Sequence, residues 1–420
     1  MTLDQSWYAR DARGWTCEPP DDGAAAFHRG LPGYAPTPLV EAPALAAELG
    51  VGRLFVKDES ARFDLRAFKY LGASWAGFRA VAARTGYTGP TTLGGLRSYL
   101  AADGRSCLAA DGSSRPADGG GGVLTLVTAT DGNHGRAVAR TARLLGLPAR
   151  VYVPKGVPDV VIDRINAEGA LLTVVDADYD GAVMAARADA DAEADVTPGG
   201  GAPTCGGPST GGGTGGMLIQ DTAWEGYEQV PSWIVAGYET LFAEIDAQLA
   251  AAGAAGFGGA GAGLISVPVG VGSLAQAAVA HYRSAGLPRR GRPALLSVEP
   301  DTAACVLRSL ADGALASVPT SATVMNGLNC GTPSSIAWPY LRDGLDAAIA
   351  VTDADAREAV AALSAAGVTA GPSGAAGFAG LRAALTGAGS ASRRRDLDLG
   401  AGGPPVVVCL STEGPLSDAG

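Results

Sequence analysis

The chain contains very little lysine, with only Lys57, Lys69 and Lys155 among its 420 residues. It is also poor in charge, since charged residues make up 17% and the formal net charge is −11. The longest run of basic residues is the triplet Arg393–Arg395. A chain of this kind does not attract a phosphate backbone, so we expect no nucleic-acid partner. Any mechanism that needs a lysine amine has only three candidates.

Long apolar runs are absent as well. Residues 1–30 hold no apolar signal segment, and nowhere do about 18 apolar residues follow one another without charges or glycine-rich breaks. We therefore expect a cytoplasmic protein with no membrane partner. The cysteines show no C-x-x-C spacing, which argues against a zinc site and a dense disulfide framework, and we expect no metal. They are Cys17, Cys107, Cys205, Cys305, Cys330 and Cys409.

What the sequence does contain is a regular alternation of apolar runs and alanine-rich periodic segments. This spacing predicts parallel strands joined by helices, and therefore an α/β fold. The predicted strands are Leu54–Lys57, Val123–Ala129, Arg150–Pro154, Leu171–Val175, Leu264–Val269, Ala294–Val298, Ala348–Val351 and Val406–Leu410. The predicted helices include Ala137–Leu145, Tyr179–Ala190, Ala275–Ser284 and Asp355–Ala366, several of which end at a glycine (Gly146, Gly286, Gly367).

Three glycine-rich or polar stretches interrupt this alternation, at Ala101–Gly122, Pro198–Gly216 and Gly253–Gly263. The middle stretch has too few apolar residues to offset the entropy of ordering it. We expect a mobile insertion there.

Lys69 is the most unusual of the three lysines, because Phe68 and Tyr70 flank it at the start of a predicted helix. Partial burial would lower the pKa of its amine and favour a neutral nucleophile. The alternative is a lysine that extends past two rings to the surface. The segment alone does not decide between them.

A second segment, Asp131-Gly132-Asn133-His134, joins a predicted strand to a predicted helix. Its glycine lets the backbone approach a flat ligand, and the helix start offers free N–H groups. Asn133 and His134 place hydrogen-bond donors at the carboxyl edge of the sheet. An ordinary turn with an Asp or Asn cap is the structural alternative.

The segment Gly270–Leu274 also lies between a predicted strand and a predicted helix, and its amides and Ser273 hydroxyl are typical of a phosphate-binding turn. The same glycines, with Ala275, match the G-x-G-x-x-A turn of dinucleotide-binding folds. Glu299 closes the next strand where such folds place a ribose-binding acid. A nicotinamide- or flavin-dependent oxidoreductase therefore stays an alternative.

Two further segments contain candidate polar groups. Asp221 and Glu225 lie four residues apart and would share a face if this segment were helical, although most such acids are solvated. Ser411 and Thr412 follow the last predicted strand, where a hydroxyl can contact a ring nitrogen or cap a helix.

Taken together and in this order, the motifs resemble those of the fold-type II pyridoxal-phosphate enzymes, and most closely the diaminopropionate ammonia-lyase family. The matching segments are KDESARFDLRAFKYLGAS (57–74), TATDGNHGRAVA (128–139), QDTAWEGY (220–227), MNGLNCGTP (325–333) and STEG (411–414). The resemblance implies a tryptophan synthase β-like fold of two lobes, each with a twisted, mostly parallel sheet flanked by helices. Residues 1–88 and 222–420 would form the large lobe, and residues 89–221 the small lobe. It also implies a homodimer.

The resemblance assigns a role to each matching residue. Lys69 would carry pyridoxal 5'-phosphate as a Schiff base, and Asp131 and Asp221 would be two bases, one for each enantiomer at Cα. Asn133 would bind the phenolic oxygen, and a neutral hydroxyl at the pyridine nitrogen would keep the ring a weaker electron sink and discourage transamination. The implied cofactor-binding residues are Phe68, Lys69, Asn133, Gly270, Val271, Gly272, Ser273, Leu274, Ser411 and Thr412.

The implied reaction is β-elimination from the small amino acid 2,3-diaminopropionate. The β-amine leaves as ammonia, and the resulting aminoacrylate hydrolyses to pyruvate and a second ammonia. Both carboxylates would need a pKa raised by burial to act as bases near neutral pH.

Some residues depart from the family pattern. Pro372 and Thr332 stand where the pattern has acids, which leaves a different β-leaving group open. The family also implies a cysteine pair near the entrance of the site at Cys305 and Cys330, and a disulfide between them is a hypothesis.

Three alternatives therefore accompany the ammonia-lyase. The first is a related serine or threonine dehydratase, or a β-replacement enzyme that acts on another β-substituted alanine. The second is an NAD(P)-dependent oxidoreductase that uses the Gly270–Ala275 turn. The third, favoured by Pro372 and Thr332, is a non-catalytic protein that binds a small molecule.

Overall fold

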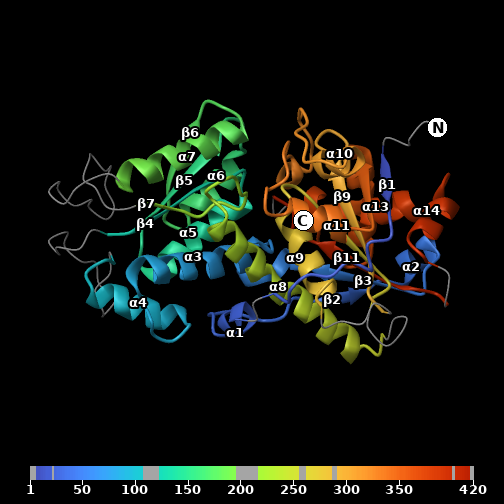
Figure 1. Cartoon of the computed structure of the whole chain (residues 1–420), viewed down its shortest axis with the longest axis horizontal. Helices are drawn as coiled ribbons and strands as arrows, with labels where there is room; N and C mark the ends of the chain where they lie inside the picture. Colours follow the sequence, from blue (N-terminus) through green and yellow to red (C-terminus); the bar gives the residue numbers. More distant parts are fainter. Residues whose placement is uncertain are drawn as a thin grey trace.

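The strands in the described part of the chain form two separate sheets (Figure 1). The structure is a computed structural model and describes residues 6–20, 23–106, 123–194, 216–254, 262–285, 291–399 and 403–416. The seven-stranded sheet has the order β1-β10-β9-β8-β11-β3-β2, and the four-stranded sheet has the order β6-β5-β4-β7. The strands are β1 (Trp7–Ala9), β2 (Leu39–Glu41), β3 (Arg53–Asp58), β4 (Thr125–Ala129), β5 (Ala149–Pro154), β6 (Leu171–Val175), β7 (Gly216–Leu218), β8 (Leu264–Pro268), β9 (Ala294–Pro300), β10 (Ala347–Val351) and β11 (Val406–Ser411).

The predicted α/β class with mostly parallel sheets is confirmed. The smaller sheet is parallel throughout, and in the larger sheet only the short edge strands β1 and β2 run antiparallel to their neighbours. Helices flank both sheets (Figure 1): α1 (Gly23–Arg29), α2 (Pro43–Leu49), α3 (Lys69–Thr85), α4 (Leu93–Ala102), α5 (Asn133–Leu145), α6 (Asp159–Asn166), α7 (Tyr179–Ala194), α8 (Gln229–Ala251), α9 (Ser273–Tyr282), α10 (Cys305–Asp312), α11 (Trp338–Gly344), α12 (Asp353–Ala365), α13 (Pro372–Leu385) and α14 (Ser390–Asp396). None of these helices combines the length and apolar character needed to cross a bilayer.

All eight predicted strands are present, with ends that differ by at most two residues. The three-residue strands β1, β2 and β7 were not predicted, because three residues are too short to show an alternating pattern. Gly146 and Gly367 take positive φ values of 72° and 82° at the ends of their helices, as predicted, whereas Gly286 lies outside the described residues. The predicted insertion also lies outside them, apart from Gly216, which begins β7.

Burial of both faces explains why the central strands read as continuous apolar runs. Along β4, Leu126 belongs to the apolar cluster that includes α5, whereas Val127 and Ala129 pack with α7. All five β4 residues are buried as a result, as expected for a parallel strand covered on two sides. The four strands of the smaller sheet all fall within residues 125–218, although the lobe boundaries at 88 and 222 stay a prediction.

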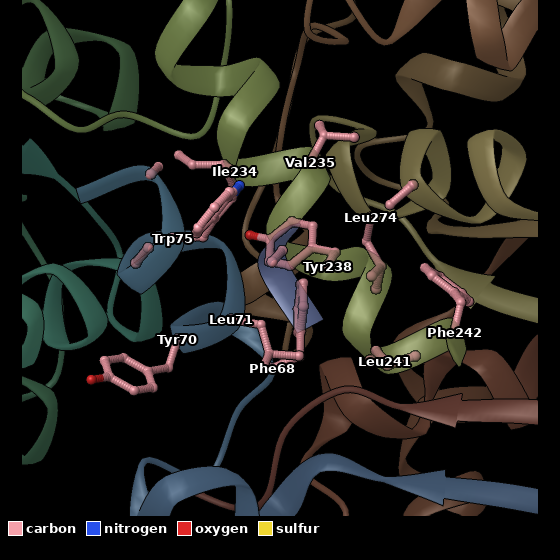
Figure 2. Close-up of a cluster of buried hydrophobic side chains, with 14 of the residues drawn as sticks. Phe68, Tyr70, Leu71, Trp75, Ile234, Val235, Tyr238, Leu241, Phe242 and Leu274 are labelled. Atoms are coloured by element: carbon pink, nitrogen blue, oxygen red, sulfur yellow. The ribbon is translucent and has the colours of Figure 1, made fainter. Parts of the chain in front are cut away.

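Helix α3 begins at Lys69 and is fixed by close packing against α8. Figure 2 shows Phe68 and Tyr238 facing each other between these helices, and their ring centroids lie 4.8 Å apart. A Cβ on Gly72 would lie 2.6 Å from the Tyr238 ring, and one on Gly237 would lie 2.5 Å from the Leu71 carbonyl oxygen. The two helices therefore approach as closely as their backbones allow, which fixes the first turn of α3.

A buried network of charges lies beneath the segment that leads to Lys69. The Lys57 amine donates to Glu244 at 2.7 Å, and the Arg62 guanidinium donates to Glu244 and to Glu59, also at 2.7 Å. Arg62 belongs to the 3-10 helix η1 (Glu59–Asp64), and all four side chains are at most 5% exposed. Two cations and two carboxylates balance, so the network carries no net charge.

Replacing Lys57 by methionine is expected to lower the free energy of unfolding by about 3–5 kcal/mol, because it leaves an uncompensated carboxylate in this network. Urea unfolding of the two proteins measures the loss. The matched control is Lys57→Met combined with Glu244→Gln, which restores neutrality and should recover part of the lost stability. A double variant whose loss equals or exceeds the sum of the two single losses would contradict the charge-balance explanation.

Candidate active site

A cavity of about 400 Å³ lies where the carboxyl ends of strands from both sheets meet. In parallel α/β proteins this edge is where ligands bind, because loops and helix N-termini converge there. The loops after several strands contribute to its wall: Thr130–His134 after β4, Pro154–Pro158 after β5, Asp178 and Tyr179 after β6, Asp221 after β7, Val269–Leu274 after β8 and Thr412–Gly414 after β11. Residues far apart in the sequence thus share one cavity.

Lys69 is the lysine best placed for chemistry. Its side chain is 22% exposed, and its amine donates to a carboxylate oxygen of Asp221 at 2.6 Å. Lys57 is held in the buried network, and Lys155 is 72% exposed and paired with Asp176 at the rim. Of the two lysines on the cavity wall, only Lys69 lies inside it.

The expected lowering of the Lys69 pKa is wrong for this state of the protein. Burial does lower the pKa, but the nearby Asp221 carboxylate outweighs burial, and the net pKa of Lys69 is raised. The sequence could not show this, because 152 positions separate Lys69 from Asp221. Lys69 is therefore an ammonium group whenever its amine is free beside Asp221.

Asp221 is held by several neighbours and is not part of a helix. Residues 221–227 form a turn in which the Trp224 and Tyr227 backbones bond to each other, so the suggested shared helix face of Asp221 and Glu225 is wrong. The Tyr179 hydroxyl lies 3.5 Å from Asp221 Oδ1 and accepts a hydrogen bond from the Gln220 side chain at 2.8 Å.

The two candidate bases differ in acidity. Burial would raise the pKa of Asp221, but the Lys69 charge reverses this and leaves the pKa lowered, so the expectation of a raised pKa is wrong for this residue. Burial raises the pKa of Asp131 to about 6, and the Asp221 carboxylate raises it while Lys69 lowers it. Asp131 therefore has the acidity expected of a base near neutral pH.

Asn133 and His134 form the start of α5 beside these carboxylates. The His134 Nε2 atom lies 2.8 Å from the Ile219 carbonyl oxygen, and its Nδ1 atom lies 3.8 Å from Asp221. Burial lowers the pKa of His134, so its ring is neutral near pH 7. The Asn133 amide donates to the carboxyl group of Glu413.

The Gly270–Leu274 turn has the form of a phosphate cradle. Gly272 has φ 97°, and a Cβ on it would lie 2.7 Å from Leu341. Helix α9 starts at Ser273, so its first N–H groups point out of the helix toward the cavity side. The Ser273 hydroxyl donates to the Asp221 carbonyl at 2.8 Å, which joins the cradle to the candidate base.

Glu299 does not support the dinucleotide alternative. It is fully buried in β9, and its two carboxylate oxygens accept hydrogen bonds from the backbone N–H groups of Val306 and Leu307 at 2.7 Å. The residue therefore caps α10 and does not line the cavity. An acid that binds a ribose would have to face the ligand.

The two hydroxyl candidates after β11 are placed differently. Thr412 lines the cavity, whereas the Ser411 hydroxyl does not line it and is buried without a hydrogen-bond partner among the described residues. Tyr179 and Glu413 are among the wall residues to which the sequence analysis assigned no role. Their position could have identified them, because each residue follows the carboxyl end of a strand.

The two residues that depart from the family pattern, Pro372 and Thr332, lie in different parts of the structure. Pro372 lines the cavity at the start of α13. Thr332 is exposed and hydrogen-bonded to Ser317, so the replacement at this position does not affect the cavity wall.

Cys305 and Cys330 are both free thiols, and the hypothesis of a disulfide between them is not met. The Cys305 sulfur points to the Gly270 carbonyl oxygen, 3.9 Å away.

Comparisons with known proteins agree with this geometry. The pyridoxal-phosphate dependent enzyme family matches residues 31–394. The diaminopropionate ammonia-lyase of Salmonella typhimurium is 36% identical over 331 residues, which cover 78% of this chain and 71% of that protein. The crystal structure of the Escherichia coli enzyme in complex with D-serine is 28% identical and superposes with a TM-score of 0.78, covering 98% of this chain and 94% of that one. The same enzyme in complex with an aminoacrylate-PLP azomethine reaction intermediate gives 29% identity and a TM-score of 0.75, with the same coverage.

Proposed function

Because this chain belongs to the fold-type II pyridoxal-phosphate dependent enzymes, on the branch of the diaminopropionate ammonia-lyases, we propose that it converts 2,3-diaminopropionate to pyruvate and ammonia. The observation that carries the proposal is the group formed by Lys69, Asp131 and Asp221 in one cavity. A lysine and two carboxylates are the groups that this elimination needs for proton transfer.

The residues present fit pyridoxal phosphate. The Gly270–Leu274 cradle would hold the phosphate, Lys69 the aldehyde carbon, Asn133 the phenolic oxygen and Thr412 the pyridine nitrogen. When the cofactor is bound, the electron pair left by removal of the Cα proton is delocalised into its ring. Thr412 lines the cavity and Ser411 does not, so we take Thr412 as the candidate for the pyridine nitrogen.

The chain's own groups would move the protons. Asp131, with its raised pKa, accepts the Cα proton of one enantiomer, and Asp221 serves the other. The Lys69 amine, which donates to Asp221 at 2.6 Å, would supply the proton that the departing β-amine needs. Tyr179 and Gln220 keep the Asp221 carboxylate in position.

The pKa of Asp131 leads to a prediction about pH. A base works only when it is ionised, so kcat/KM for the enantiomer served by Asp131 should fall as pH drops through about 6. Initial rates of pyruvate formation for each enantiomer across this range measure the effect. The acidic limb should be missing from the residual activity of Asp131→Asn. A limb of unchanged midpoint in that variant would assign the titration to another group.

The experiment that tests the proposal is a substrate panel on purified enzyme loaded with pyridoxal phosphate. D- and L-2,3-diaminopropionate should yield pyruvate at least about tenfold faster than D- or L-serine yields pyruvate or threonine yields 2-oxobutyrate. Faster release of pyruvate from serine, or of 2-oxobutyrate from threonine, would establish a dehydratase in its place. The homodimer and the cytoplasmic location belong to the same proposal, and light scattering of the loaded enzyme tests the dimer.

The dehydratase is retained as the second candidate for two reasons. Pro372 on the cavity wall replaces an acid of the family pattern, which removes a possible contact for a second amine. The Escherichia coli relative has also been crystallised with D-serine.

A further inference from the structure

Glu413 occupies a rigid position on the cavity wall, directly after β11. The backbone on both sides of it is tied to the segment before Lys69, because Phe68 donates to the Thr412 carbonyl at 3.2 Å and Gly414 donates to the Arg66 carbonyl at 2.9 Å. The Glu413 carbonyl itself accepts from Gly371 at 3.0 Å. The side chain is therefore directed into the site by a fixed main chain.

Two neutral groups hold the Glu413 carboxyl. One oxygen accepts a hydrogen bond from the Asn133 amide, and the neutral Ser373 hydroxyl lies close enough to lower the pKa of the same carboxyl group. Ser373 also accepts from the Gly327 N–H at 3.2 Å, which leaves its single hydroxyl proton free for Glu413. A Cβ on Gly374 would lie 2.3 Å from the Glu413 carbonyl oxygen, so the start of α13 packs directly against this residue.

No cation of the described residues forms an ion pair with Glu413, in contrast to Asp221. Pro372, next to Ser373, brings neither charge nor an N–H group to this part of the wall. A carboxyl group on the cavity wall with only neutral donors keeps a proton more readily than one that faces a lysine or arginine. The chain therefore retains an acid at the cofactor site although it lacks the acid at position 372.

We propose that Glu413 is a positioning residue that acts through Asn133 and sets the protonation state of the bound cofactor. The proposal rests on the cofactor site proposed above. Thr412 remains the hydroxyl proposed for the pyridine nitrogen, and Glu413 would act on the phenolic oxygen, through the Asn133 amide. An ionised Glu413 repels negative charge on that oxygen, whereas a protonated Glu413 does not, so the charge carried by the bound ring would change with pH.

The surroundings of Glu413 predict how this control responds to pH. Burial raises the pKa of Glu413 to about 7; the Asp131 carboxylate also raises it, whereas Ser373, Asn133 and the Lys69 charge lower it. The other titratable groups on the wall nearby are His134, Tyr179, Asp221 and Cys330. Glu413 should thus lose its proton near neutral pH.

The test is a pH titration of the visible absorption band of the loaded enzyme, from about pH 5 to about pH 9. The wild-type band should change in one transition near pH 7, and Glu413→Gln, which preserves shape, should remove it. Ser373→Ala should move the midpoint upward, because the ionised carboxylate loses a donor. Asp131→Asn should move it downward, because a neighbouring negative charge is lost.

A wild-type band that does not change with pH, or a transition that survives in Glu413→Gln, would overturn the proposal. If Glu413→Gln fails to fold or to bind the cofactor, the midpoint shifts of Ser373→Ala and Asp131→Asn test the proposal. Midpoints that move in the same direction in these two variants would overturn the proposal. Absence of a cofactor band in the wild-type protein would instead reject the proposed function. The two failures are therefore distinguishable.

Discussion

Replacing Lys69 by alanine is expected to abolish the visible band of lysine-bound pyridoxal phosphate and to lower kcat by about a thousandfold or more. Lys69 is the only lysine inside the cavity, since Lys57 is locked in a buried ion-pair network and Lys155 is at the exposed rim. The variant would lose both the attachment point and the amine that lies against Asp221. Absorption spectra of the loaded proteins and pyruvate assays measure the two losses.

Borohydride reduction supplies the matching control. Reduction of the wild-type enzyme should fix the cofactor on the peptide that contains Lys69, as mass spectrometry of a digest would show. Lys155→Ala should keep the band, because its amine pairs with Asp176 outside the cavity interior. Reduced cofactor found on Lys57 or Lys155 would contradict the assignment of Lys69.

Asp131→Asn and Asp221→Asn are each expected to lower kcat/KM by about 10²–10⁴-fold for one enantiomer of 2,3-diaminopropionate and much less for the other. Each change removes one base and keeps the size of the side chain. Pyruvate release from the separate D- and L-enantiomers measures the selectivity. Asp221→Asn also removes the partner of Lys69, so the cofactor band of each variant must be recorded alongside.

The pattern across the two variants decides the outcome. Opposite enantiomer selectivity would support two separate bases. Equal losses on both enantiomers in both variants, with cofactor binding intact, would contradict the two-base assignment. Equal losses in Asp221→Asn alone would mean that Asp221 acts by holding Lys69.

Much of the architecture could be predicted from the sequence, because buried parallel strands leave continuous apolar runs. The strands Leu171–Val175 and Val406–Leu410 were predicted to within one residue, since turns and helical segments bound them clearly. The edge strands β1 and β2 could not be predicted, because their three residues are specified by the neighbouring strands.

The electrostatics of the site were not predictable, because they depend on distant pairs. The sequence left burial and surface exposure of Lys69 both open, and in the structure its net pKa is raised by Asp221, which the fold brings to 2.6 Å. The same contact lowers the pKa of Asp221 and separates it from Asp131, whose pKa is raised. Asp131 and Asp221 could not be distinguished as bases from the sequence, but they differ in pKa in the structure.

Glu413 was not identified as a site residue from the sequence, although it lies within the matching segment Ser411–Gly414. The segment Ser411–Gly414 attracted attention for its hydroxyls, but only the structure places the Glu413 carboxyl against Asn133. The two departures from the family pattern are likewise separated only by the fold. Thr332 lies at the surface, whereas Pro372 lines the cavity, so Pro372 alone bears on substrate choice.

The ratio of ammonia to pyruvate tests the central claim most directly. Loaded enzyme supplied with 2,3-diaminopropionate should release two molecules of ammonia for each pyruvate, because the β-amine leaves in the elimination and the α-amine leaves when the enamine product reacts with water. Both products can be measured in the same sample by coupled assays. A ratio of one, or release of ammonia without pyruvate, would contradict β-elimination as the reaction of this site.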